Sequence, residues 1–397
     1  MSEPTINART VPSPSPGRGG TLASPGLTVM TGATGFLGSH LLARLLHGPD
    51  DIVALVRDDS VQTWNRLDAA LKATGHPLPC DYHSRLHLEQ ITLSEPGLAI
   101  APARYRELAD RMHTLWHCAG MIDLVGDREQ LHQTNVLGTR SVLALAGAAR
   151  RRPRVIHVST AFVAGARLSG VMYEDELDDR HGFLTSYEWS KYHTERAVHE
   201  WAAKHGHPVL ILRPSVLLTD RVLTGGVPRH PHAVVGARLR ALGRRGPTVL
   251  GCPAPVTEPV VVRLPGHPDS VNNIVQVEYA AEAMIRLASR PPERLVDTVH
   301  VTHPDETPWQ TIADATQQFV PWLQVRLEPS HTTLSPVETV FAEQGYAGAD
   351  RYFILRRSYD RSRLRAALDG ALPEPAPITP AYLGATFGAH ALTASSV

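Results

Sequence analysis

The chain has 397 residues, of which 43% are hydrophobic, so it can bury a large core as one large domain or two moderate ones. Lys plus Arg and Asp plus Glu each number 39, and this balance argues against nucleic-acid or membrane binding through a global positive field. Three scattered cysteines without a CxxC pair argue against a disulfide framework, and the lack of an apolar leader or spanning stretch predicts a soluble, cytoplasmic protein.

The first half of the chain predicts strands that alternate with helices. Residues 1–25 are rich in Ser, Pro, Gly and Thr without hydrophobic periodicity, so we expect a disordered tail. The alternation after this tail indicates parallel βαβ units with right-handed crossovers, and therefore a doubly wound α/β Rossmann sheet. The predicted strands are Leu27–Met30, Ile52–Val56, Thr114–Cys118, Val155–Ser159 and Val209–Leu212, with helices after the first strand and at 136–149 and 187–203.

Beyond Arg213 the regular alternation ends. Residues 225–268 are rich in Gly, Pro and Arg, which predicts loops and a short helix near 234–243. We expect the chain to return to the sheet through a helix at 278–289 and a strand at Thr298–Thr302, and then to form a C-terminal helical part. The predicted organisation is a tail at 1–25, a Rossmann core at 26–215, and a smaller, interleaved substrate subdomain at 216–397 from which 272–303 return to the core.

A glycine-rich turn, Thr31-Gly32-Ala33-Thr34-Gly35-Phe36-Leu37-Gly38, lies between the first predicted strand and helix. Its spacing and context are those of a dinucleotide-binding turn. Glycine permits a tight turn and a close approach of the backbone to pyrophosphate, and the following helix N-terminus opposes the phosphate charge. The residues expected to bind a cofactor here are Gly32, Thr34, Gly35, Phe36, Leu37 and Gly38.

The end of the second predicted strand bears on the choice of cofactor. NAD enzymes usually place a carboxylate there for the ribose 2′-hydroxyl, whereas an arginine accommodates the 2′-phosphate of NADPH. This chain has Leu55-Val56-Arg57, which favours NADPH, although Asp58 and Asp59 follow directly. The alternative interpretation is that Arg57 is a solvated surface charge.

Thr160, Tyr187 and Lys191 form a candidate catalytic set. Tyr187 and Lys191 are four residues apart, so a helix places both on one face, where the ammonium would lower the phenol pKa and hold ribose hydroxyls. Thr160 follows a predicted strand and could donate a hydrogen bond to a substrate oxygen, with Ser159 as the competing hydroxyl. The alternative interpretation is a Tyr and a Lys on an ordinary amphipathic helix.

The order and separation of these segments resemble the extended short-chain dehydrogenase/reductase superfamily. The glycine-rich turn and the segments Leu55-Val56-Arg57, His157-Val158-Ser159-Thr160 and Leu212-Arg213-Pro214-Ser215 look like its thioester reductase-like branch. That branch includes terminal reductase domains, carboxylic acid reductases and fatty acyl reductases. The resemblance covers about residues 27–310 and is strongest in the cofactor-binding half.

The resemblance implies roles for further residues. Placing Gly165 on the family's terminal glycine selects Thr160 rather than Ser159 as the catalytic hydroxyl. Asn135 lies in a helix start typical of extended members, where it would either shape the central helix or support a water relay near Lys191.

Other residues are expected at the cofactor. Arg66 resembles the second of two arginines that NADPH-dependent members use, with Arg57 as the first. The small residues after the strand that ends at Cys118 would let the cofactor lie close, although core packing explains them almost as well. The additional cofactor contacts expected are Ala119, Gly120, Lys191, Pro214 and Ser215.

By this resemblance, hydride from NADPH would reduce an acyl thioester, bound to a carrier protein or to CoA, to an aldehyde or alcohol. Two departures from the family pattern, Val275-Gln276-Val277-Glu278 and Thr219, indicate a reshaped substrate pocket. One rival is an enzyme of the same superfamily acting on a ketone, an aldehyde or a sugar nucleotide. A second is a non-catalytic, nucleotide-sensing Rossmann protein, against which the intact catalytic set argues.

Histidines offer two candidate metal sites. His113 and His117 with Cys118 span one predicted central strand and lack a fourth ligand. His230 and His232 lie in a stretch rich in Pro and Arg. We therefore predict no metal site.

Overall fold

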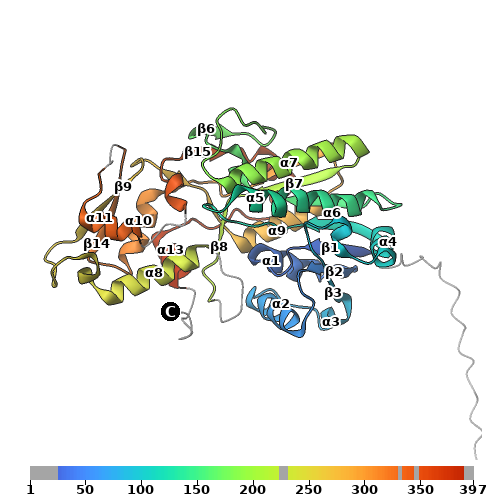
Figure 1. Ribbon diagram of the computed structural model, residues 1–397, viewed down its shortest axis with the longest axis horizontal. Coiled ribbons are helices and arrows are strands. Elements are labelled where there is room, and N and C mark those ends of the chain that lie inside the picture. Colours follow the sequence, from blue (N-terminus) through green and yellow to red (C-terminus); the bar gives the residue numbers. More distant parts are fainter. Residues whose placement is uncertain (1–25, 223–230, 330–332, 344–347, 389–397) are drawn as a thin grey trace, which may run out of the picture.

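The computed structural model describes residues 26–222, 231–329, 333–343 and 348–388 (Figure 1). The tail expected to be disordered, residues 1–25, lies outside these described residues.

A parallel sheet of seven strands in the order β12-β7-β5-β4-β1-β2-β3 forms the centre of the fold. Its order reverses direction at β1, which is the topology of a doubly wound sheet and confirms the predicted fold class. The strands are β1 (Leu27–Thr31), β2 (Asp51–Val56), β3 (Leu86–Gln90), β4 (Met112–His117), β5 (Arg154–Val158), β7 (Val209–Pro214) and β12 (Val296–Val301).

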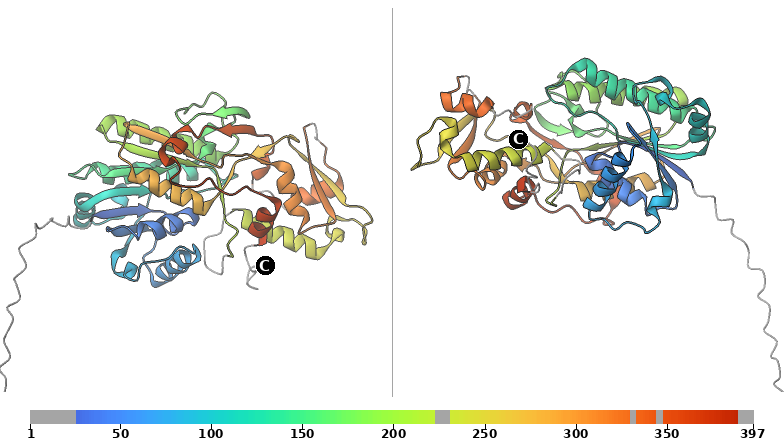
Figure 2. Two further views of the ribbon diagram at one scale, coloured as in Figure 1. Left: turned by 180° about the vertical axis from the view of Figure 1, so that it is seen from behind. Right: turned by 60° about the horizontal axis from the view of Figure 1, so that its bottom comes forward.

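Helices cover both faces of this sheet (Figures 1 and 2). Side chains alternate along each strand, so Met30 of β1 packs in one core while its neighbour Val29 packs in the other. One core lies under α1 (Phe36–Leu45), α2 (Val61–Ala73), α9 (Val277–Ser289) and α12 (Ser362–Leu368), and the other lies under α4 (Pro102–Arg111), α6 (Gly138–Gly147) and α7 (Ser186–His205).

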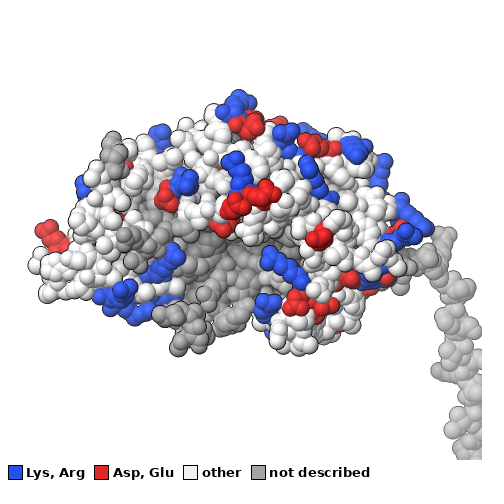
Figure 3. Space-filling model, viewed as in Figure 1, with Lys and Arg blue, Asp and Glu red and all other residues white. Residues whose placement is uncertain are grey.

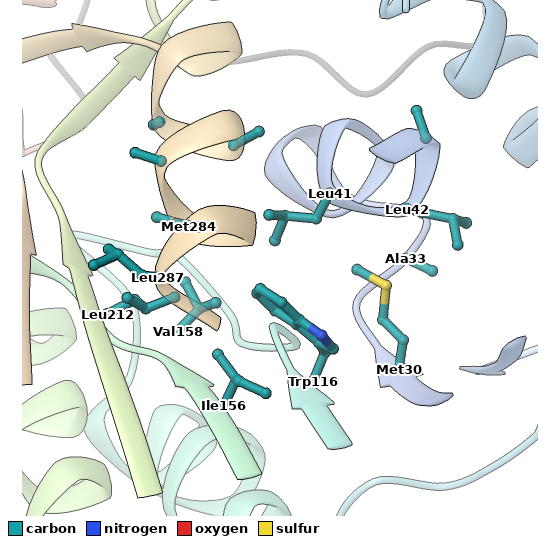
Figure 4. Packing of buried hydrophobic residues seen from close by; sticks show 14 of the residues in the cluster. Met30, Ala33, Leu41, Leu42, Trp116, Ile156, Val158, Leu212, Met284 and Leu287 are labelled. Carbon is teal, nitrogen blue, oxygen red and sulfur yellow. The ribbon is translucent and has the colours of Figure 1, made fainter. Parts of the chain in front are cut away.

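Figure 4 shows the first of these cores. The fully buried Trp116 of β4 lies between the strands and helix α1, which contributes Leu41 and Leu42, while Met284 and Leu287 approach from α9. Because α1 carries the glycine-rich turn at its start, this packing fixes the turn against the sheet.

The strand β3 was not predicted, and the helices on either side of it were expected only as helical runs between strands, without bounds. Its sequence, Leu-His-Leu-Glu-Gln, alternates apolar and polar residues and forms the edge of the sheet, whereas the predicted strands were continuous apolar runs. The predicted helix at 136–149 begins earlier, as a π-helical segment at His132–Leu137 that continues into α6.

A smaller part of the chain packs at the carboxyl end of the sheet, beside β8 (Val216–Leu218) and β11 (Ile274–Gln276) (Figure 2). Its core includes Leu239, Leu264 and Phe387. The helices are α8 (Pro231–Arg245), α10 (Trp309–Gln317), α11 (Pro336–Glu343) and α13 (Pro380–Gly388), around the parallel pair β9 (Val260–Pro265) and β14 (Leu323–Glu328).

The C-terminal part is less helical than expected, because β14 pairs with β9, and β15 (Arg356–Tyr359) pairs with β6 (Ser169–Met172). Through α9 and β12 the chain also contributes to the central sheet, where β12 lies beside β7 at the edge. The exact domain boundaries stay a prediction. The shorter elements are α3 (Tyr82–Arg85), α5 (Arg128–Leu131), β10 (Val271–Asn272) and β13 (Thr307–Pro308).

Candidate active site

A cavity of about 720 Å³ lies where the carboxyl ends of β1, β4, β5 and β7 meet the smaller C-terminal part. This edge of a doubly wound sheet is where such folds bind ligands. Most of the residues selected from the sequence line it: Gly32, Gly35, Phe36, Leu37, Gly38, Gly120, Thr160, Tyr187, Lys191, Pro214 and Ser215. Five others do not line it: Thr34, Arg57, Arg66, Ala119 and Asn135.

The glycine-rich turn is shaped so that two of its positions admit no side chain. Gly32 has φ of +75°, and a Cβ atom there would lie 2.6 Å from the backbone nitrogen of Ala119. A Cβ atom on Gly38 would lie 1.9 Å from the carbonyl oxygen of Gly32. Helix α1 then begins at Phe36 without a side-chain hydrogen bond from its N-cap residue, Gly35. The N-terminus of a helix favours an anion through its backbone N–H groups and its dipole.

Two further observations show that the cavity fits a dinucleotide. The hydroxyl of Ser215 is buried at the cavity wall, and among the described residues it has no hydrogen-bond partner. The backbone N–H of Ala119 donates to the hydroxyl of Thr31 at 3.1 Å, which holds the loop after β4 against the glycine-rich turn. A nicotinamide dinucleotide could therefore lie across the turn with a polar partner at Ser215.

The structure separates the two candidate hydroxyls. The hydroxyl of Ser159 donates to the buried carboxylate of Glu195 at 2.6 Å. The hydroxyl of Thr160 makes a long contact, 3.5 Å, with the carbonyl oxygen of Pro214, accepts from the N–H of Phe162, and hydrogen-bonds with the Tyr187 phenol. Since Ser159 is engaged with Glu195, Thr160 is the hydroxyl that is available to the cavity beside Tyr187.

Tyr187 lies in the first turn of α7 and points into this cavity with Lys191. Burial raises the pKa of the Tyr187 phenol to about 12, while a hydrogen bond with Thr160 opposes this shift. The expectation that Lys191 lowers the Tyr187 pKa was therefore wrong, because desolvation of the phenol dominates. A phenol with this pKa keeps its proton at neutral pH.

The side chain of Lys191 lines the cavity, and the backbone of β5 holds its ammonium. Its Nζ atom donates to the carbonyl oxygen of Val158 at 3.0 Å. Burial lowers the Lys191 pKa to about 8, and the carboxylate of Glu195 partly offsets this effect. The ammonium is thus fixed at the end of β5, one residue before the two candidate hydroxyls.

Asn135 lies behind the cavity wall, in the π-helical segment. Its Oδ1 accepts from the N–H of Met121 at 2.7 Å, and its Nδ2 donates to the carbonyl oxygen of Met121 at 3.0 Å and to the hydroxyl of Ser190 at 2.9 Å. These contacts fix the loop after β4 against helix α7. The amide is therefore fully used in joining structural elements, which supports the shaping role over the water relay.

The two arginines assigned to the 2′-phosphate lie outside the cavity lining, exposed at the end of β2 and on α2. Arg66 donates to the hydroxyl of Thr63 at 2.9 Å. The neighbouring carboxylate of Asp58 accepts from the N–H and hydroxyl of Ser60 and from the hydroxyl of Thr63. Asp58 thus supports Ser60, whose hydroxyl caps the start of α2 by accepting from the N–H of Thr63, whereas Arg57 is exposed.

The sequence did not reveal the other half of the cavity wall. It is largely apolar, it comes from elements between Val216 and Phe387, and it includes one phenol, Tyr352. These positions are scattered over the region without a motif, so no spacing in the sequence indicates that they converge. Representative residues of this half are Leu239, Leu264, Trp309, Phe341 and Phe353.

Metal-ligand clusters are not found in the described ranges, where no group of three or more His, Cys, Asp or Glu side chains could hold an ion. His117 instead hydrogen-bonds through its two ring nitrogens to the hydroxyls of Thr31 and Thr139. His230 lies outside the described residues. Acidic and basic side chains are interspersed on the face shown in Figure 3, in keeping with the balanced formal charge.

A family model described as "Male sterility protein", an NAD-binding family, matches residues 30–284. The chain belongs to this family. The family and the parallel sheet identify a nicotinamide-dependent oxidoreductase of the short-chain dehydrogenase/reductase type. The resemblance to the thioester reductase-like branch is confirmed. Family membership confirms a nicotinamide cofactor at the level of NAD(P).

Curated relatives of this member include an aldehyde reductase, lnaA, from Aspergillus flavus, 24% identical over 87% of the chain and 34% of the relative. A carboxylic acid reductase from Mycobacterium tuberculosis is 26% identical over 78% of the chain and 27% of the relative. The chain thus spans about a third or less of the length of these relatives. The crystal structure of the terminal R domain from the myxalamid PKS-NRPS pathway is similar in fold, with a TM-score of 0.71 at 21% identity over 93% of this chain and 91% of that one.

None of the helices that the structure describes combines the length and the apolar character needed to cross a lipid bilayer.

Proposed function

We propose that this family member uses NADPH to reduce an acyl thioester to an aldehyde, and onward to an alcohol where a second reduction follows. The observation that carries the proposal is the convergence of Thr160, Tyr187 and Lys191 on one cavity with the glycine-rich turn. When bound, the nicotinamide would supply the hydride. The protein's own side chains would donate the proton, stabilise the carbonyl oxygen and orient the cofactor.

Negative charge develops on the carbonyl oxygen as hydride reaches the carbon. The catalytic set can donate a proton and a hydrogen bond to this oxygen. Tyr187 carries its proton at neutral pH, as an unperturbed phenol also does, and burial raises its pKa further, to about 12. It can therefore act as the general acid. Thr160 supplies a hydroxyl beside it that can donate to the same oxygen. Lys191, fixed by the carbonyl of Val158, lies below both groups and could hold the nicotinamide ribose.

The choice of NADPH rests on the arginines near β2. The carboxylate of Asp58 already accepts three hydrogen bonds, from the N–H and hydroxyl of Ser60, which caps α2, and from the hydroxyl of Thr63. Arg57, directly after β2, and Arg66, on α2, are exposed cations. They support a 2′-phosphate contact, for which a charge-assisted hydrogen bond from guanidinium is well suited.

The acyl group is proposed to arrive on an acyl carrier protein or on CoA. Relatives of this chain include proteins named nonribosomal peptide synthetase asaC and isonitrile lipopeptide synthase, and a similar fold occurs in a thiolation-reductase di-domain. Interactions with nucleic acid or membrane form no part of the proposal, and a cytoplasmic location is proposed on the balanced charge and the few cysteines.

Release of free thiol tests the proposal, because reduction of a thioester frees a thiol whereas reduction of a ketone or a sugar nucleotide does not. The purified protein should oxidise NADPH and release thiol with a panel of acyl-CoA and acyl-pantetheine substrates. Tyr187→Phe should lower turnover by about two to four orders of magnitude while NADPH binding is retained. The matched control is Tyr173→Phe, which removes an exposed phenol and should leave turnover unchanged.

Efficient reduction of a ketone or aldehyde, with no thiol released from any thioester, would contradict the thioester proposal and leave only the wider reductase class. Undetectable turnover with every carbonyl would support a nucleotide-sensing protein instead.

A further inference from the structure

A second phenol enters the cavity from the C-terminal part of the chain. Tyr352, at the end of a 3-10 turn at Ala349–Tyr352, lines the same cavity as Thr160 and Tyr187. Its ring packs edge-on against Phe162, two residues after Thr160, with 5.0 Å between ring centroids. Tyr352 therefore lies in the cavity next to the segment that carries Thr160.

Contacts on both flanks of Tyr352 hold it there. Its hydroxyl lies 3.3 Å from the hydroxyl of Thr185, the residue that caps helix α7. The guanidinium of the preceding Arg351 donates to the carbonyl oxygen of Leu184 at 3.1 Å. Both contacts join the Tyr352 turn to the first residues of α7, immediately before Tyr187.

Arg357 anchors the same segment to the loop that carries Thr160. This buried guanidinium donates to the carbonyl oxygen of Gly165 at 2.7 Å and lies over the ring of Phe162, 5.3 Å from its centroid. The position of the Tyr352 phenol is thus fixed relative to both catalytic elements.

The residue after Tyr187 places a buried carboxyl group next to this phenol. Glu188 is fully buried, and its Oε2 accepts from the N–H of Leu184 at 2.7 Å, while its Oε1 has no close hydrogen-bond partner among the described residues. Burial raises the Glu188 pKa, and the groups from other elements that oppose this shift are Arg357 and Tyr352. A proton on Glu188 is therefore less costly than on an ordinary glutamate, and Tyr352 is one of the side chains that interact with this carboxyl group.

Thioester reduction needs one proton transfer to the carbonyl oxygen and a second to the leaving sulfur. The catalytic set of Thr160, Tyr187 and Lys191 supplies only the first. Hydride adds to the carbonyl carbon while Tyr187 protonates the oxygen, which gives a tetrahedral hemithioacetal. In its collapse the carbonyl re-forms, the hydroxyl proton returns to Tyr187, and the carbon–sulfur bond breaks with its electron pair on sulfur. The leaving sulfur then needs a proton of its own.

We propose that Tyr352 is a further catalytic residue, which passes a proton from the buried carboxyl group of Glu188 to the departing sulfur. The net reaction consumes one hydride and one proton and yields an aldehyde and a thiol, and Glu188 regains its proton from solvent through Tyr352 after the thiol leaves. Transfer from a carboxylic acid to a thiolate is favourable, because the thiol holds the proton more tightly. This inference rests on the proposed thioester reduction.

The test measures hydride transfer and thiol release separately within a single turnover. Enzyme in excess, saturated with NADPH, is mixed with octanoyl-CoA, and NADPH absorbance is recorded while quenched samples are assayed for thiol against an enzyme-only blank. In the parent protein, oxidation of the first equivalent of NADPH should coincide with thiol release. In Tyr352→Phe, which keeps the ring against Phe162, NADPH oxidation should stay near the parent rate while thiol release slows by about two orders of magnitude.

Three matched measurements make the result specific. Glu188→Gln keeps the acceptor for Leu184 but carries no acidic proton, so it should show the same delay. Tyr173→Phe, on an exposed phenol, should show none. Replacing CoA by thiophenol as the leaving group should abolish the delay in Tyr352→Phe, because the more acidic thiol departs as a thiolate without help.

Equal slowing of both signals in Tyr352→Phe, or a delay that persists with the thiophenyl ester, would overturn the inference in favour of a purely structural role. Thiol release at the parent rate in both Tyr352→Phe and Glu188→Gln would also overturn it. Absence of NADPH oxidation and of thiol release in the parent protein would instead overturn the proposed function itself.

Discussion

Glu195 and Arg213 form an ion pair that is almost entirely removed from solvent, with side-chain exposures of 0% and 2%. The Nε atom of Arg213 lies 3.0 Å from Oε1 of Glu195, and the hydroxyl of Ser159 donates to the other carboxylate oxygen at 2.6 Å. One buried carboxylate thus ties together β5, α7 and β7, which are three of the elements that position the catalytic set.

Removing one partner of this pair should destabilise the fold. In Arg213→Met the Glu195 carboxylate would stay buried without its counter-ion, so we expect the free energy of unfolding to fall by about 3–5 kcal/mol. Urea unfolding of the parent and the variant measures this difference. Arg140→Met, on an exposed residue of α6, is the matched control, and an equally small effect of both substitutions would contradict the prediction.

The glycine-rich turn should tolerate no methyl group at Gly38. A Cβ atom there would lie 1.9 Å from the Gly32 carbonyl oxygen, so Gly38→Ala must displace the turn on which the pyrophosphate is proposed to lie. We expect NADPH affinity, measured by fluorescence titration, to fall by at least about tenfold, the equivalent of one lost hydrogen bond. Gly147→Ala, whose Cβ would meet only the Trp201 ring at 3.6 Å, should bind NADPH normally.

Arg57 should decide between the two nicotinamide cofactors. NADPH should bind more tightly than NADH, and Arg57→Ala should narrow the gap by about 1.5–3 kcal/mol, the value of a lost charge-assisted contact. Calorimetric titration of both cofactors measures this change, with Arg140→Ala as the surface control. Equal affinities for NADPH and NADH in the parent protein would refute the assignment.

The cofactor-binding half could be predicted because its chemistry depends on backbone turns and helix spacing that are local in the sequence. Gly32 and Gly35 lie just before helix α1 and Gly38 lies in its first turn, and Tyr187 and Lys191 are four residues apart on α7. Other site residues were chosen by resemblance to the family. Thr160, which follows β5, is one example.

The substrate-facing half could not be predicted, because its residues converge only through tertiary packing. Tyr352 meets Phe162 across 190 residues of chain. The direction of the Tyr187 pKa shift was also missed, since spacing on a helix predicts that an ammonium is near but does not predict how much water the fold removes from the phenol. Ser159 could be set aside only once its contact with Glu195 was visible.

The charge of Lys191 should make cofactor binding depend on pH in the mildly alkaline range. Burial lowers its pKa to about 8, so the ammonium is charged below that pH and loses its proton as the pH rises through it. A neutral amine attracts the anionic cofactor less, so NADPH affinity should fall between about pH 7.5 and 9, a window centred on this pKa. The measurement is the NADPH dissociation constant from pH 6.5 to 9.5 at constant ionic strength.

Lys191→Met provides the decisive comparison, because it keeps most of the buried stem but cannot titrate. It should bind NADPH weakly at every pH, without the transition near pH 8, while the thermal midpoint confirms that the fold is retained. Lys72→Met, which removes a largely exposed ammonium on α2, should keep the parent profile. If Lys191→Met retains the same loss of affinity across this window, another group is titrating and Lys191 does not control the binding.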